Sequence, residues 1–182
     1  MSPLLESGTP LAAYYAQTRS RTGEVLARRS LGTLDAVTIG RYAMTIGATD
    51  PKHYDPAHAR AAGYADVVAP PNMLAAIVEW GLGTPEARLQ PDGTPHDGDM
   101  PLGDGDLGLR VMGAGEEMEL VNPVIAGTEL VLETTLEAVT PKQTRAGSCV
   151  FVTTINTFMS AEGAVLNRNR RTVVLRNPLQ ES

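Results

Sequence analysis

The chain has 182 residues, which is enough for one domain with a buried core. Its 42% hydrophobic and 20% charged residues are ordinary for a globular protein, and its formal net charge of −6 argues against a nucleic-acid partner. The single cysteine, Cys149, cannot form an internal disulfide. We find no N-terminal signal pattern and no run of roughly 18 apolar residues for a membrane span, so we expect a cytoplasmic protein without membrane contact.

The first half of the chain predicts helices. Residues 1–35 are interpreted as an N-terminal extension, with a helical patch around Leu11–Gln17 followed by a polar, arginine-rich stretch. Apolar residues at spacings of two to four predict a helix over 36–47. Asp55 and Pro56, which precede A-H-A-R-A-A and Gly63, predict a compact helix with an aspartate cap and a glycine exit. A third helix is expected over 71–82, with a broad apolar face.

The second half predicts strands. A Gly-, Asp- and Pro-rich surface loop is expected at about 84–108, and its aspartate pairs do not have the spacing of a calcium loop. Alternating apolar residues then predict strands near 109–121, 128–139, 149–158 and 165–176, with a hairpin turn at 160–163. Helices followed by a run of antiparallel strands indicate the α+β class.

One segment carries the chemical information in this sequence. Residues 47–59 are G-A-T-D-P-K-H-Y-D-P-A-H-A, and residues 61–71 are A-A-G-Y-A-D-V-V-A-P-P. The first string resembles the signature G-D-x-N-P-x-H-x-D-x-x-x-A of the MaoC-like (R)-specific enoyl thioester hydratases, and the second is similar to their FAS1-like dehydratase branch. Residues 119–130, E-L-V-N-P-V-I-A-G-T-E-L, resemble the family's later pattern P-x-x-A-G-x-x-L.

The resemblance implies a hotdog fold, in which a curved antiparallel β-sheet wraps around a central α-helix. Residues 71–82 would be that helix. The resemblance covers roughly residues 36–176, which we interpret as a single hotdog domain, and residues 177–182 would be a C-terminal tail. The family works as pairs of hotdogs, so we expect a homodimer or a heterodimer with another hotdog subunit.

The resemblance also implies roles for particular residues. In the family, an aspartate and a histidine five residues later hold the attacking water, and a backbone N–H at the start of the central helix stabilises the thioester oxygen. His53 falls on the histidine, whereas Ala48 replaces the aspartate. Asp50 is therefore either a displaced catalytic carboxylate or a helix-stopping turn residue. Pro70 and Pro71 have no N–H, so the first available donors are those of Asn72 and Met73.

For several other polar residues, a structural role competes with a functional role. Arg170, on a predicted strand with Arg168 and Arg171, either contacts the phosphates of coenzyme A or protects a sheet edge. His58 and Asp55 are interpreted as helix surface and N-cap. We expect no metal and no cofactor other than the coenzyme A or acyl carrier protein that carries the substrate.

Three functions follow from these residues. The first is a hydro-lyase that interconverts a trans-2-enoyl thioester and a 3-hydroxyacyl thioester, as in fatty acid metabolism. The second is a non-catalytic subunit that houses the acyl chain while a partner chain supplies the catalytic residues, since Ala48 is what such a subunit would carry. The third is a hotdog thioesterase, for which Glu79 is the only carboxylate on the expected central helix.

Overall fold

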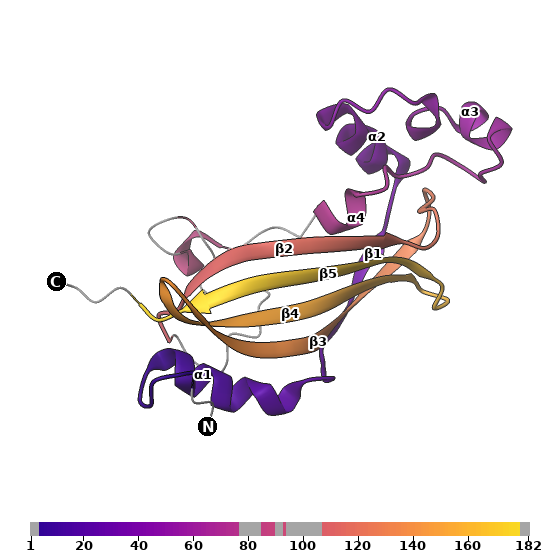
Figure 1. The fold of residues 1–182 in the computed structure, drawn as a ribbon. Helices are drawn as coiled ribbons and strands as arrows, with labels where there is room; N and C mark the ends of the chain where they lie inside the picture. The colour runs from indigo at the N-terminus through magenta and orange to yellow at the C-terminus, as the bar shows by residue number, and fades with distance from the viewer. Residues whose placement is uncertain (1–3, 77–84, 90–92, 94–106, 179–182) are drawn as a thin grey trace.

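A five-stranded antiparallel sheet dominates the computed structural model, which describes residues 4–76, 85–89, 93 and 107–178 (Figure 1). The strand order is β1-β3-β4-β5-β2. The strands are β1 Val25–Thr33, β2 Arg110–Leu120, β3 Glu129–Thr144, β4 Gly147–Ser160 and β5 Val165–Arg176. The α+β prediction is therefore confirmed, and the strands that we predicted near 109–121, 128–139, 149–158 and 165–176 are all present.

Four short α-helices accompany the sheet in the described residues. They are α1 Pro10–Thr18, α2 Ala36–Thr45, α3 Pro56–Ala61 and α4 Met73–Ala76. Of the helix expected over 71–82, residues 73–76 form α4, Pro71 and Asn72 form a turn before it, and residues 77–82 lie outside the described residues. Most of the loop expected at 84–108 also lies outside them. Within the described part of the chain, no helix combines the length and the apolar character that a membrane crossing requires.

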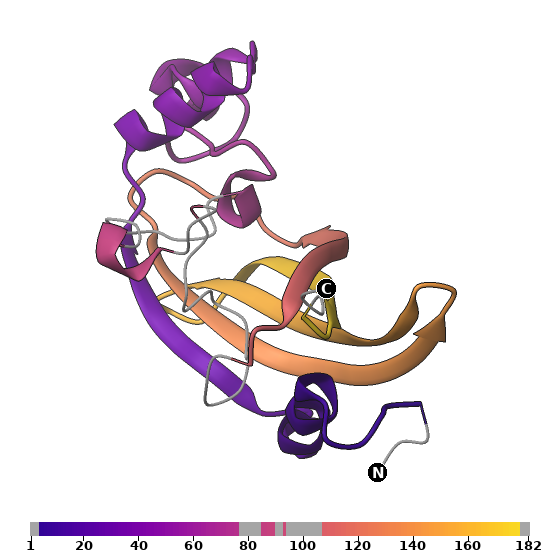
Figure 2. The same ribbon diagram turned by 90° about the vertical axis from the view of Figure 1, so that its left-hand side faces the viewer.

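The sheet is curved, and the helices of residues 36–76 lie on its concave side and beyond one of its ends. Figure 2 shows α4 on the concave side and the segment with α2 and α3 beyond one end of the strands. Met73 and Leu74 of α4 are buried in an apolar cluster with Leu130, Phe158 and Leu166 of the sheet. Asn167 of β5 also donates its side-chain N–H to the Pro71 carbonyl at 3.2 Å. These contacts fix the start of α4 against the sheet.

The N-terminal segment belongs to the sheet. The arginine-rich stretch, for which we predicted no strand, forms β1, and β1 pairs with β3 along most of its length. At the end of the sheet away from α2, Leu11 and Tyr14 of α1 are fully buried in a second apolar cluster with sheet residues such as Leu136 and Val152. Residues 1–35, interpreted as an extension, thus contribute a strand and part of the core.

Truncation of Leu11 tests that role of α1. We expect Leu11→Ala to lower the free energy of unfolding by about 2 to 5 kcal/mol, because it removes a fully buried side chain and leaves a cavity. Urea unfolding followed by circular dichroism gives this number. Leu4, which is 41% exposed in the same segment, provides the matched control, and Leu4→Ala should cost much less. A loss in Leu11→Ala as small as that expected for Leu4→Ala would contradict the role of α1 in the core.

Candidate functional site

Two aspartate-capped turns shape the segment that carries His53. Asp50 begins a single 3-10 turn, Pro51–His53, and its carboxylate accepts the backbone N–H of Lys52 at 3.0 Å. Asp55 begins α3 in the same way, because its carboxylate accepts the N–H of Ala57 at 2.7 Å. A proline follows each aspartate and fits the first position of the turn, where no N–H is needed. The two caps leave His53 at the end of the first turn and fix its direction.

His53 is the buried polar residue of this segment. It is only 6% exposed, and its Nδ1 lies 2.6 Å from the carbonyl oxygen of Val68. Val68 is itself held in place, because its N–H donates to the Lys52 carbonyl at 3.1 Å and it forms a β-bridge with Ile125. The imidazole is therefore oriented by a backbone group that Lys52 and Ile125 hold in place.

This contact decides which ring nitrogen can act as a base. A carbonyl oxygen only accepts hydrogen bonds, so Nδ1 of His53 must carry the proton in the Val68 contact. In the neutral ring the lone pair then lies on Nε2, which can take a proton from water. The arrangement provides one oriented acid–base group.

Neither Ala48 nor Asp50, the two described candidates, takes the place of the missing aspartate. Ala48 is half-buried, and its carbonyl oxygen accepts the hydroxyl of Tyr54 at 2.6 Å. Asp50 binds Lys52 instead, with 2.7 Å between Oδ2 and Nζ. Hydrogen bonds from the Lys52 side chain and backbone lower the pKa of the Asp50 carboxyl, which makes Asp50 a weaker base. The geometry thus favours the turn interpretation of Asp50 over the catalytic one.

The start of α4 offers one free amide donor. The N–H of Met73 donates to the Pro70 carbonyl at 3.0 Å, and the Met73 side chain is fully buried. Asn72 is exposed, and within the described residues its N–H has no acceptor. Of the two donors predicted from the sequence, Asn72 is therefore the one available to a ligand.

The remaining candidates lie apart from His53. Arg170 is on the outer face of the sheet, where it forms ion pairs with Glu137 and Glu117. His58 pairs with Asp55 on the exposed side of α3. Glu79 lies outside the described residues. Within the described ranges, no group of three His, Cys, Asp or Glu side chains is placed to hold a metal ion.

Two features of the site had not been predicted. The Val68 carbonyl, which orients His53, is 15 residues away in sequence, and the bond from Val68 to Lys52 and the bridge to Ile125 hold it there. Tyr54, next to His53, ties the loop back to Ala48. The two valines of the motif, Val67 and Val68, were the only sign in the sequence of the contact to His53. Nothing in the sequence pattern indicated the contact between Tyr54 and Ala48.

Comparison with known proteins identifies the class and then the family. A solved MaoC-like dehydratase from Rhodospirillum rubrum is 28% identical, with a TM-score of 0.59 over 87% of this chain and 94% of that one. The fold is therefore the hotdog of the MaoC-like dehydratases. The family model for the FAS1-like dehydratase domain region matches residues 22–168, and the chain belongs to that family.

Two further proteins are similar to this chain. One subunit of the ChsH1-ChsH2 complex of Mycobacterium tuberculosis has the same fold, with a TM-score of 0.67, 21% identity and coverage of 94% of this chain and 93% of that one. A probable enoyl-CoA hydratase alpha subunit from Thermomonospora curvata is 28% identical over 79% of this chain. The chain spans 45% of that protein's length and 58% of a UPF0336 protein from Parafrankia sp..

Proposed function

We propose that this chain is a hydratase or dehydratase subunit that adds water reversibly to a trans-2-enoyl thioester. The observation that carries the proposal is the buried His53, whose Nδ1 is bound by the Val68 carbonyl and whose Nε2 is left as the basic nitrogen. Membership of the FAS1-like dehydratase family supports the reaction type. The substrate would be carried on coenzyme A or acyl carrier protein.

The residues present suffice to write the reaction. Nε2 of His53 takes a proton from water as the water oxygen bonds to the β-carbon of the enoyl group. Electron density moves to the thioester oxygen, which the free N–H of Asn72 stabilises. The imidazolium then returns the proton to the α-carbon, so one water is added and His53 is neutral again. Dehydration follows the same steps in reverse.

A second function rests on Ala48. With a methyl group at this position and Asp50 bound to Lys52, the site has a histidine without the family's carboxylate. In that case the chain would be the acyl-binding member of a pair, and another hotdog chain would supply the catalytic residues. The ChsH1-ChsH2 complex and the relative named as an alpha subunit support a heteromeric assembly.

Either function needs a second hotdog, and β2 is where we propose that it binds. β2 is at the edge of the sheet, and ten of its eleven residues are exposed. Val111, Met112 and Leu120 are between 42% and 54% exposed, so the strand offers apolar side chains that a partner could cover. A strand from a partner would pair with this edge and cover them.

Enoyl thioester hydration tests the proposal directly. The purified chain is assayed with crotonyl-CoA and longer enoyl-CoAs, alone and with hotdog proteins that copurify with it. Turnover by the chain alone is expected and would remove the second function. If turnover required a partner and were abolished by changes to the partner's own acid–base residues, the second function would be established. No hydration but release of free thiol would instead indicate a thioesterase.

A further inference from the structure

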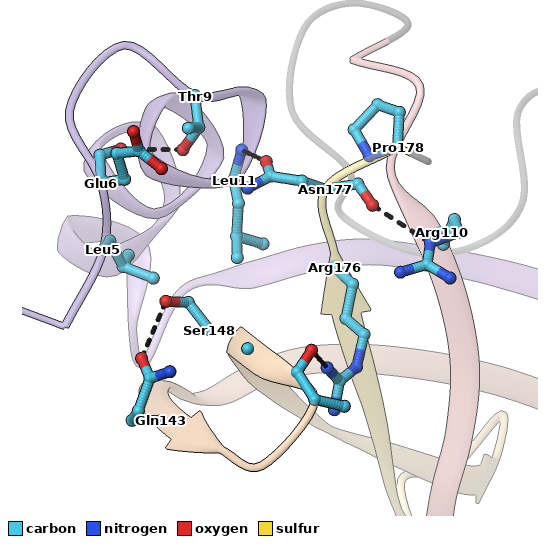
Figure 3. A pocket seen from close by; sticks show the side chains of 12 residues that line it. Leu5, Glu6, Thr9, Leu11, Arg110, Gln143, Ser148, Arg176, Asn177 and Pro178 are labelled. Carbon is cyan, nitrogen blue, oxygen red and sulfur yellow. Dashed lines mark hydrogen bonds between the residues drawn. The ribbon is translucent and has the colours of Figure 1, made fainter. Parts of the chain in front are cut away.

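A cavity of about 320 Å³ lies at the end of the sheet away from His53, between α1, the turn after β3 and the last residues of β5 (Figure 3). Leu5 and Pro178 give it apolar walls, and Gln143 and Asn177 line it with side-chain amides. Its volume is at the lower end of the range for small-molecule sites. The feature that singles it out is a pair of arginines, Arg110 and Arg176, in its wall.

The two arginines face each other across neighbouring strands. Arg110 of β2 is the direct cross-strand partner of Arg176 of β5. Like charges in directly opposed positions of an antiparallel pair destabilise the sheet. Within the described residues neither guanidinium has an ion-pair partner, and Glu6, which also lines the cavity, lies beyond ion-pairing distance of both.

Other arginines of the same sheet show the contrast. Arg28 pairs with Glu133, and Arg168 pairs with Glu119, each on an adjacent strand. In a chain with a net charge of −6, glutamates are abundant enough to neutralise strand arginines. Arg110 and Arg176 differ from these two arginines because each stands directly opposite another arginine and has no carboxylate partner among the described residues.

Both guanidinium groups keep most of their donors free. Each has five N–H donors. Arg110 uses one on the Asn177 carbonyl at 3.1 Å, and Arg176 uses two, on the Ala146 carbonyl at 2.7 Å and the Thr144 hydroxyl at 3.1 Å. These bonds to neutral oxygens hold the side chains in place without cancelling their charge. Oriented guanidinium groups with free N–H donors suit the oxygens of a carboxylate or a phosphate.

We propose that this cavity binds the oxyanion group of a small organic ligand, either a carboxylate or a phosphate ester. The anion would bridge Arg110 and Arg176, and the short apolar part of the ligand would lie against Leu5 and Pro178. The site is separate from the one that contains His53, because α1 lies at one end of the strands and the segment with α2 and α3, which carries His53, lies at the other (Figure 1). It therefore does not depend on the proposed hydratase activity.

Calorimetric titration of the full chain with sodium phosphate and with sodium succinate, at an ionic strength held constant with sodium chloride, tests the site. We expect saturable binding of at least one probe. Arg110→Gln should weaken it by about tenfold or more, since a charged hydrogen bond is lost. The affinity of Arg110→Lys should lie between those of the unchanged protein and Arg110→Gln, because lysine keeps the charge but lacks the planar donors of arginine. Arg145→Gln is the control. It removes a positive charge from the turn after β3, but Arg145 itself does not line the cavity, so this variant should bind the probes as the unchanged protein does.

The outcomes separate the sources of the anion. Binding of phosphate alone assigns a phosphate ester, and binding of succinate alone assigns a carboxylate. Absence of saturable binding of both probes to the unchanged chain would overturn the proposal. An equal loss in Arg145→Gln and Arg110→Gln would overturn it too, since the effect would then be general charge attraction.

Discussion

Replacement of His53 by glutamine is expected to lower kcat/KM for enoyl thioester hydration by about 10² to 10⁴, the usual contribution of an acid–base group. Glutamine retains a side-chain N–H that can reach the Val68 carbonyl, so the turn is expected to keep its shape while the basic nitrogen is lost. The assay uses whichever form of the protein is active, alone or with its partner. Circular dichroism and the melting temperature verify the fold.

Two control variants sharpen this expectation. His58→Gln changes a histidine five residues away on the exposed side of α3, and it should leave the rate unchanged. Asp50→Asn should change the rate only a few-fold, because the carboxylate of Asp50 is engaged with Lys52. If Asp50→Asn abolished turnover while His53→Gln did not, Asp50 would be the base and our assignment would be wrong.

Introduction of a carboxylate at position 48 is expected to raise activity. Ala48→Asp places an acid five residues before His53, at the position where the resemblance expects one, and should increase kcat by about tenfold or more. Ala48→Asn has almost the same shape without the charge and serves as the matched control. Since Ala48 contacts Tyr54 through its backbone carbonyl, neither change removes that hydrogen bond.

The comparison of these two variants also decides between the two functions. A gain in Ala48→Asp over Ala48→Asn would show that His53 and Asn72 already form a working site that lacks one group. If both variants were as inactive as the unchanged chain, while a partner restored turnover, the chain would be the acyl-binding member of a heteromeric pair.

The sequence predicted well those helices and strands whose ends are determined by neighbouring residues, such as caps and turn residues. The α3 helix was predicted from the aspartate cap, Pro56 and Gly63, and the cap and the left-handed glycine are both present. β5 was predicted with its observed bounds because its apolar residues are flanked by turn signals. β3 runs on to Thr144, beyond the predicted Val139, because Pro141 and the polar residues after it resemble a turn yet pair with β4.

β1 could not be predicted because it has no apolar alternation. None of its residues is fully buried, and two irregularities in its pairing with β3 break the period. Its position is set by β3, more than 90 residues later, which no local pattern contains. The same limit applies to the site: position 53 was predicted from the motif, but the partner of its ring depends on the bridge between Val68 and Ile125.

The exposed edge at β2 has a consequence for how the chain behaves on its own. An open strand edge is the part of a folded protein most prone to join strands of unrelated chains and aggregate. β2 carries Glu116, Glu117 and Glu119 in its second half, and charged side chains on an edge discourage such pairing. Glu117 and Glu119 also pair with Arg170 and Arg168 of β5, so these glutamates both hold β2 on the sheet and discourage indiscriminate pairing at its edge.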